Sequence, residues 1–149
     1  MAIRSALAVL FAACAGALTI AAPAAATPPE GQVVRTDLAK YDIPFSLPGL
    51  PPGPTTVIVQ QLLLKPPSSS GWHTHEGLEV SLVTRGSVVL QTSTNCAGTT
   101  YGTGQVVVIP AGVPHRVANT STRDAEALVT YTLPAGTPAR NDAPNACAA

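Results

Sequence analysis

Charged side chains are scarce in this chain of 149 residues, and neither sign is in excess. Asp, Glu, Lys and Arg make up 11% of the residues, and 8 basic side chains balance 8 acidic ones. The chain has no basic stripe of the kind that binds nucleic acid, so we expect no nucleic-acid partner. Disorder is not expected either, because 46% of the residues are hydrophobic and the net charge is zero. The length fits one domain with a substantial core.

Residues 1–26 carry a single charge, Arg4, ahead of a long apolar run. Of these 26 residues, 21 are Ala, Val, Ile, Leu, Met, Phe or Cys, and three alanines close the segment. This is the layout of a secretory signal peptide, so we expect its removal, export to the periplasm or the cell exterior, and no membrane contact of the mature protein. Two alternatives stay open: a retained membrane anchor, for which the uncharged run 6–22 is short, and lipidation at Cys14.

Two cysteines remain beyond the expected signal peptide, Cys96 and Cys147. In an oxidising compartment outside the cytoplasm, two such residues are candidates for a disulfide that closes a long loop. The alternative is two independent thiols, one of them on a frayed C-terminus. The sequence leaves both open, because spacing does not show whether the two residues approach each other.

Residues 55–134 have the pattern of an all-β domain. Short runs rich in β-branched residues alternate with turn-forming segments such as KPPSSSG and PAGVP, without helical periodicity or an internal repeat. The pattern predicts six strands in a sandwich or barrel. The segment NCAGTTYGTG is expected to be a loop between two of them. The expected strands are 55–64, 78–86, 87–93, 104–110, 115–121 and 126–134.

The segments on either side of this domain lack its pattern. Residues 27–54 are rich in Pro, and we expect an arm or an edge strand lying over the core. Residues 134–149 are polar and rich in Pro and Ala, so we expect an irregular C-terminal tail. The predicted organisation is a signal peptide (1–26), a Pro-rich arm (27–54), a single barrel domain (55–133) and a tail (134–149).

The three histidines of the chain fall in two short segments that also contain a well-placed carboxylate. Residues two apart on a strand point to the same side, so His73 and His75 share a face. Glu79 follows across a turn and can return to that facing, and His115, after PAGVP, can meet the others from across the barrel. Three imidazoles and one carboxylate suit a divalent Mn, Fe, Ni, Cu or Zn ion. The alternative is a set of structural or surface histidines.

Two motifs in these segments resemble those of the cupin superfamily. The first, G(X)5HXH(X)3,4E(X)6G, is matched by His73, His75, Glu79 and Gly86, except that Pro67 stands where the motif opens with Gly. The second, G(X)5PXG(X)2H(X)3N, is matched at every fixed position. Its residues here are Gly104, Pro110, Gly112, His115 and Asn119. The resemblance covers residues 55–133 and is typical of a small single-domain cupin of the cupin 2 type.

The resemblance implies an all-β, jelly-roll-like barrel with one divalent transition metal held inside it by His73, His75, Glu79 and His115. Four protein ligands around an octahedral metal leave two positions for water or a ligand. The resemblance names no reaction, because cupins include dioxygenases, oxalate-degrading enzymes, isomerases, sugar epimerases, storage proteins and sensors. Exported germin-like cupins and small quercetinase-like dioxygenases share this ligand set.

Three functions follow from the resemblance, and the first is favoured. The chain is expected to be a metal-dependent, dioxygenase-like oxidoreductase acting on a small organic substrate, with Glu79 also serving as a base, as in dioxygenase members. The second alternative is a non-catalytic module that binds or senses a small ligand through its metal. The third is a barrel that the metal only braces. Because small cupins commonly pair through edge strands, a homodimer is expected.

A few other side chains could belong to the site, and each also has a plainer structural interpretation. Trp72 either caps the pocket or packs beneath the Pro-rich arm, and packing is favoured. Tyr131 either points at the metal as a proton donor or fills the barrel, which is favoured. Gln60 could line the pocket opposite His115. Two further side chains are expected in solvent, Arg116 and Glu76.

Overall fold

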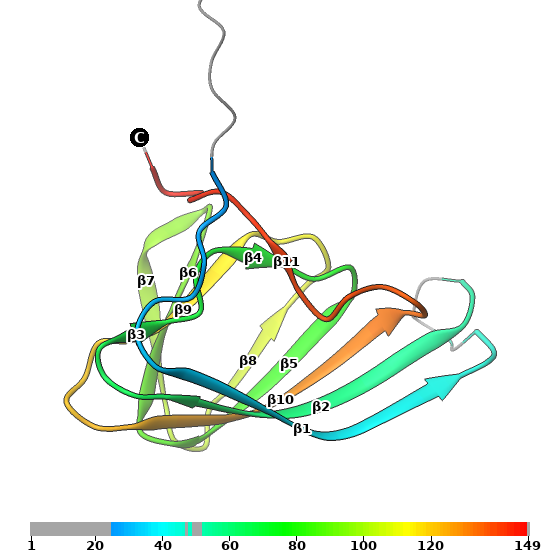
Figure 1. The fold of residues 1–149 in the computed structure, drawn as a ribbon, viewed down its shortest axis with the longest axis horizontal. Coiled ribbons are helices and arrows are strands. Elements are labelled where there is room, and N and C mark those ends of the chain that lie inside the picture. Colours follow the sequence, from blue (N-terminus) through cyan, green and yellow to red (C-terminus); the bar gives the residue numbers. More distant parts are fainter. Residues whose placement is uncertain (1–24, 47, 49–51, 149) are drawn as a thin grey trace, which may run out of the picture.

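The computed structural model describes residues 25–46, 48 and 52–148, which form two antiparallel sheets facing each other (Figure 1). Strands are the regular secondary structure over these residues, so the all-β prediction is confirmed. No helix in the described part of the chain is long and apolar enough to cross a membrane. Residues 1–24, which make up most of the expected signal peptide, lie outside the described residues.

The first sheet has five strands in the order β1-β2-β10-β5-β8, and every neighbouring pair is antiparallel. Side chains alternate along β10 between buried and more exposed positions, as expected for a strand with one face on a core. The inner face of this sheet forms one wall of the barrel. Its strands are β1 (Val33–Ile43), β2 (Thr55–Leu64), β10 (Ala125–Pro134), β5 (Leu78–Arg85) and β8 (Val106–Ile109).

The second sheet has six strands and forms the facing wall. Its order is β11-β4-β9-β6-β7, and β3 pairs with β9 beside this path. The two strands that begin with a histidine, β4 and β9, are direct neighbours. The strands of this sheet are β11 (Asn141–Asp142), β4 (His73–Thr74), β9 (His115–Asn119), β6 (Ser87–Thr92), β7 (Asn95–Gly102) and β3 (Ser68–Ser69).

Apolar side chains from both sheets fill the space between the walls. One buried cluster joins Leu64 and Val83 of the first sheet to Val88 of the second, and another joins Leu90 to Val107. Burying one such side chain fully stabilises the fold by roughly 1.5–3 kcal/mol. The polar residues described below therefore lie at one end of a packed apolar barrel.

All six predicted strands are present, with ends that differ by up to two residues. The prediction of a loop at NCAGTTYGTG was wrong, because most of this segment is the edge strand β7, which pairs with β6. Its run of Thr99, Thr100 and Tyr101 has high β-propensity. The glycines that suggested a loop are tolerated because β7 is an edge strand with a shifted register near Leu90.

The Pro-rich segment contains a long strand. Of the two expectations for residues 27–54, the edge strand is the one that the structure shows, since β1 pairs with β2 from Val33 to Ile43. A β-bulge interrupts this pairing between Asp37 and Ala39. The segment ahead of β1 runs beside the C-terminal tail, where the Thr27 amide donates to the Ala143 carbonyl (Figure 1).

The expectation of an irregular tail without core packing needs correction. Residues 141–142 form β11, which pairs with β4, and Ala143 is buried. A disulfide joins Cys147 of the tail to Cys96 of β7, which resolves the alternatives left open by the sequence. The tail lacks an apolar run, so its docking depends on backbone pairing and this covalent bond, neither of which leaves a hydrophobic signal in the sequence.

Candidate metal centre

Three imidazoles and one carboxylate meet at one end of the barrel. All four side chains are buried, and their potential ligand atoms lie within 4.8 Å of one another. His73 belongs to β4 and His75 follows that strand, His115 begins β9, and Glu79 lies on β5 of the opposite sheet. The fold thus brings together the four residues that the sequence singled out.

The position of His115 differs from the expectation in one respect. His115 does not face the other histidines from across the barrel, because its strand pairs directly with β4 and its register partner is His73. The imidazole rings of this pair have centroids 4.1 Å apart. Glu79 is the residue that comes from the opposite wall, so the centre joins the two sheets.

Backbone carbonyls hold all three imidazoles in orientation. The Nδ1 atoms of His73 and His115 lie 2.9 Å from the carbonyl oxygens of Gly71 and Val113. The Nδ1 atom of His75 lies 2.5 Å from the carbonyl oxygen of a tail residue, Ala139. A carbonyl only accepts, so each Nδ1 must carry the proton and donate it. An uncharged ring with its proton on Nδ1 has its lone pair on Nε2, the tautomer that metal-binding histidines use.

The carboxylate of Glu79 has a different partner at each oxygen. Oε1 accepts a hydrogen bond from Ser81 Oγ at 2.6 Å. Oε2 lies 2.6 Å from His75 Nε2 and 3.5 Å from His115 Nε2. Ser81 lies on the same face of β5, two residues along, and thereby fixes the rotation of the carboxylate. One oxygen is anchored, and the other faces the histidines.

Burial and charge shift the pKa values of two groups in the centre. Burial, reinforced by the nearby charges of His115 and Arg140, lowers the pKa of His73 to about 2, so its ring is neutral at physiological pH. Burial by itself would raise the pKa of Glu79. The close approach of the His115 and His75 imidazoles to the carboxylate outweighs burial and holds that pKa well below its usual range. Glu79 is therefore ionised.

The centre fits a cation. His75 Nε2 and His115 Nε2 are buried without a hydrogen-bond partner, and both face the ionised Glu79 oxygen. A lone pair and a carboxylate oxygen at this distance repel unless a positive charge lies between them, either a proton or a metal ion. Because the donors are imidazole nitrogens and a carboxylate oxygen, the cluster can hold a divalent transition metal.

Glycines of the motif region allow the close approaches that build this centre. At Gly77, in the turn between β4 and β5, an added Cβ would lie 1.9 Å from the Thr132 carbonyl oxygen. Gly112 has φ of +72° in the turn before His115, and its amide donates to the His75 carbonyl at 2.8 Å. A side chain at position 77 is excluded by this contact, and one at position 112 is disfavoured by the backbone conformation.

Comparison with known proteins supports the same assignment. A family model described as a cupin domain matches residues 61–131. Residues 61–131 thus form a cupin domain, and the chain has the cupin barrel fold. A cupin superfamily protein from Desulfitobacterium hafniense is 16% identical, with a TM-score of 0.52 over 70% of this chain and 80% of that one. A cupin 2 conserved barrel domain protein from Salinispora arenicola is 21% identical, with a TM-score of 0.51 over 66% and 74%.

At these identities the two structures share a fold with this cupin, and nothing further about its activity follows from them. A search of the curated proteins found no match. The function of this cupin must therefore be argued from its own residues.

Tyr131 lies against the metal centre and also fills the barrel. Its ring is 4.7 Å from that of His75, and Glu79 is its register partner on the neighbouring strand. It also belongs to a buried cluster with Val129 and Leu133. Burial, with a further contribution from the charge of Glu79, raises the pKa of Tyr131 well above its usual range. The phenol is thus a hydrogen-bond donor that stays protonated.

The interior of this cupin leaves little space beneath the centre. A cavity of about 20 Å³ borders Glu79 and Ser81 and is otherwise lined by apolar side chains such as Leu62 and Val107. This volume holds about one water molecule. This cavity therefore has no room for an organic ligand beneath the metal centre.

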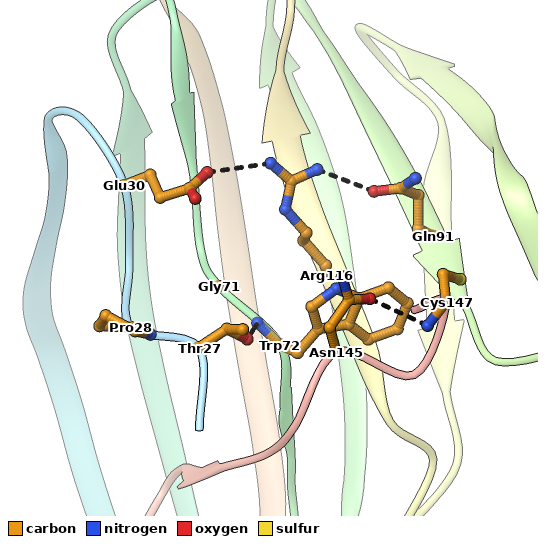
Figure 2. A pocket seen from close by; sticks show the side chains of 9 residues that line it. All are labelled: Thr27, Pro28, Glu30, Gly71, Trp72, Gln91, Arg116, Asn145 and Cys147. Carbon is orange, nitrogen blue, oxygen red and sulfur yellow. Dashed lines mark hydrogen bonds and ion pairs between the residues drawn. The ribbon is translucent and has the colours of Figure 1, made fainter. Parts of the chain in front are cut away.

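A second pocket, drawn in Figure 2, is bordered by residues next to the histidines in sequence. It has a volume of about 220 Å³ and is lined by Trp72 and Arg116, each adjacent in sequence to a histidine of the centre. Neighbouring residues on a strand point to opposite faces, so this pocket is separate from the centre. Trp72 is buried beneath Thr27 and Pro28, so it packs under the N-terminal segment, as favoured from the sequence.

The expectation that Arg116 is simply solvated was wrong. Its guanidinium is half-buried and donates to Gln91 Oε1 and Glu30 Oε2 (Figure 2). It also donates to Ser69 Oγ. Gln60, which was expected opposite His115, donates from Nε2 to Asp37 Oδ1 at 2.6 Å. Glu76 is exposed, as predicted, and accepts a hydrogen bond from the tail residue Asn141.

Two arginines near the centre were not singled out by the sequence. Arg140 of the tail and Arg35 of β1 both act electrostatically on Tyr131, and Arg140 also acts on His73. Arg35 points into the barrel because it lies two residues beyond Val33, which packs on the core. Both residues come from segments outside the cupin motifs, so no motif spacing pointed to them.

Proposed function

We propose that this chain is an exported metal-binding cupin that acts as a metal-dependent, dioxygenase-like oxidoreductase on a small organic substrate. The observation that carries the proposal is the convergence of the imidazole nitrogens of His73, His75 and His115 on one ionised carboxylate oxygen of Glu79. The assignment of an oxidation reaction rests on the chemistry of this donor set, which suits redox-active Mn, Fe, Ni or Cu as well as Zn.

In this proposal, His73, His75, His115 and Glu79 hold one divalent metal ion. The ion supplies positive charge and free coordination positions at which substrate and dioxygen can bind. The protein contributes fixed imidazole tautomers, through the carbonyls of Gly71, Val113 and Ala139. The protein also restricts access of bulk water through the barrel, because the interior beneath the centre is packed.

Glu79 is the proposed proton acceptor of the reaction. It is the one carboxylate of the cluster and is ionised, so it can take a proton from a substrate bound beside it. Ser81 holds Oε1 during such a transfer and keeps the carboxylate in place. Tyr131, protonated and next to Glu79 in the sheet, is positioned to donate a hydrogen bond to a bound oxygen.

Binding without turnover is the second candidate function. The lowered pKa of Glu79 makes it a weak base, and the raised pKa of Tyr131 makes it a weak acid. Efficient general acid–base catalysis at neutral pH needs pKa values near 7. The pKa shifts of Glu79 and Tyr131 favour a site that binds a metal and a ligand over one that catalyses rapid proton transfer.

Export is supported by the disulfide between Cys96 and Cys147. Such bonds persist in oxidising compartments and are rare in the cytosol. The amino-terminal sequence has the layout of a signal peptide, as described above. Fractionation of cells that express the full chain tests this part: processed protein outside the cytoplasm supports export, and full-length protein retained in the cytoplasm contradicts it.

We also propose a homodimer formed through the free edge of the five-stranded sheet. Three side chains on its outer face, Leu128, Leu82 and Val106, are register neighbours and are exposed. They lead to β8, the last strand of this sheet, which also exposes Val108. Antiparallel pairing of two copies of β8 would continue both the sheet and the apolar row. A Val108→Lys variant should sediment as a monomer, and an unchanged dimer would contradict this interface.

Metal analysis combined with oxygen uptake tests the proposed function. Protein purified from its native export route should contain one transition metal per chain and consume dioxygen with a member of a panel of small phenols. A Glu79→Gln variant should lose turnover. The matched control is Glu76→Gln, an exposed acid in the preceding turn, which should retain both properties. Bound metal with no turnover of any compound would favour the binding function, and absence of metal would contradict both.

A further inference from the structure

Arg140 presents an unusual set of unsatisfied donors beside the metal centre. Its Nε atom lies 2.6 Å from the Asp142 carboxylate. Its two terminal nitrogens, Nη1 and Nη2, are buried and have no hydrogen-bond partner in the described part of the protein. Buried charged donors without partners are costly, and in native proteins they usually point to an acceptor that binds there.

The position of Arg140 indicates where such an acceptor would lie. Ala139, the preceding residue, accepts the hydrogen bond from His75, and Asp142 is the register partner of His73. The charge of Arg140 acts on His73 itself. The guanidinium therefore lies beside the histidines, on the tail segment that pairs with β4.

A second guanidinium adds to the positive charge of this region. Arg35 points inward from β1, and burial, followed by the charge of Arg140, lowers its pKa from the ordinary value. Arg35 and Arg140 thus interact with each other, and the carboxylate of Asp142 is paired with Arg140. Asp37, the acid nearest Arg35 along β1, is held by Gln60. With a divalent ion in the centre, the positive charges of the ion and the two arginines would exceed the negative charges of Asp142 and Glu79.

We propose that Arg140, assisted by Arg35, binds the carboxylate group of the small-molecule ligand of this centre. Because Nε is engaged by Asp142, the free Nη1 and Nη2 atoms form the pair of parallel donors that matches the two oxygens of a carboxylate. Arg140 lies at the end of an irregular segment, residues 135–140, that also contacts His75 through Ala139. This inference rests on the proposed function and narrows its substrates to small organic acids.

Binding of a matched pair of probes tests the assignment. Benzoate and benzamide have the same size, and only benzoate carries the carboxylate. Zinc-loaded protein, in which redox turnover is absent, should bind benzoate, and Arg140→Gln should weaken that binding about 10- to 100-fold without changing benzamide binding. Arg140→Lys, which keeps the charge but not the paired donors, should give a smaller loss. Arg123→Gln, an exposed arginine on the β9–β10 turn, is the control and should bind benzoate normally.

The metal content of every variant is measured in parallel, so that this inference and the proposed function fail separately. Zinc-loaded protein that binds benzoate no better than benzamide would overturn the inference, as would an Arg140→Gln variant with full benzoate affinity. If Arg140→Gln does not fold, Arg140→Lys decides the question by the same criterion. If the protein binds no metal yet prefers benzoate through Arg140, the proposed function is wrong and the arginine assignment stands.

Discussion

The barrel segment, residues 55–134, and the two terminal segments over it, residues 25–43 and 135–148, contribute to the same centre in different ways. The barrel segment supplies all four candidate metal ligands. The terminal segments supply the carbonyl that orients His75 and the two arginines near the centre. The motif-bearing part thus determines which ion can bind, and the flanking parts shape what can approach it.

The largest effect should follow loss of a ligand in the barrel segment. His75→Ala removes one nitrogen donor and its contact with Glu79. Since loss of an outer-shell partner alone costs about 10- to 100-fold in metal affinity, we expect a decrease above about 100-fold, measured by competition with a chelating dye. Glu76→Gln should bind metal normally. A His75→Ala variant with wild-type affinity would show that the cluster is not the metal site.

The metal-free barrel should also lose stability in acid. The pKa of His73 is lowered to about 2 in the fold from its ordinary value of 6.5, so below pH 6.5 the unfolded chain takes up a proton that the folded chain does not. The lowered pKa of Glu79 acts in the same direction below the ordinary value of 4.5. Stability therefore falls with decreasing pH, by about 1.4 kcal/mol per pH unit for each proton.

Urea unfolding of metal-free protein between pH 7 and 3 measures this slope. A His73→Gln variant should show a shallower dependence, because its side chain does not titrate. A variant that retains the full wild-type slope would mean that His73 does not carry the effect.

The next effect concerns the terminal segments. Cys147→Ser removes the bond that fixes the tail to β7 and should lower the free energy of unfolding by about 2–4 kcal/mol. Because the tail supplies the Ala139 carbonyl to His75, metal affinity should fall by about 10-fold or more. The reciprocal variant, Cys96→Ser, removes the same bond from the β7 side and should lower both quantities to a similar extent. Unchanged metal affinity in the Cys147 variant would show that the tail is independent of the centre.

A smaller effect is expected at Ser81. Ser81→Ala removes the hydrogen bond to Glu79 Oε1 and leaves the four ligands in place. A hydrogen bond to a charged group contributes about 1.5–3 kcal/mol, so metal affinity should fall by no more than about 100-fold and by less than in His75→Ala. Titration with zinc measures the difference. Equal losses in the two variants would contradict the division between ligand and supporting residue.

The sequence predicted the barrel segment well because its residues obey local rules. Alternating β-branched runs gave the six strands, and two motifs gave the four residues that the fold brings together. The error at β7 has a local cause as well: Gly98 and Gly102 indicate a loop, whereas pairing with β6 imposes a strand. Tertiary pairing outweighed local propensity at this edge.

The contribution of the terminal segments could not be predicted in the same way. The hydrogen bond from His75 goes to a backbone carbonyl, which every residue possesses, so Ala139 carries no signal of its role. Arg140 reaches the centre only because β11 pairs with β4, and a two-residue strand leaves no periodic pattern. The place of His115 beside His73 could not be predicted either, because it depends on strand order and not on motif spacing.

Anomalous diffraction from crystals of the metal-loaded protein tests the central claim most directly. The account predicts one strong peak at the metal's absorption edge, at about 2.0–2.2 Å from imidazole nitrogens of His73, His75 and His115 and from a Glu79 oxygen. A peak at another place, such as the pocket lined by Trp72 and Arg116, or no peak in protein exposed to excess metal, would contradict it.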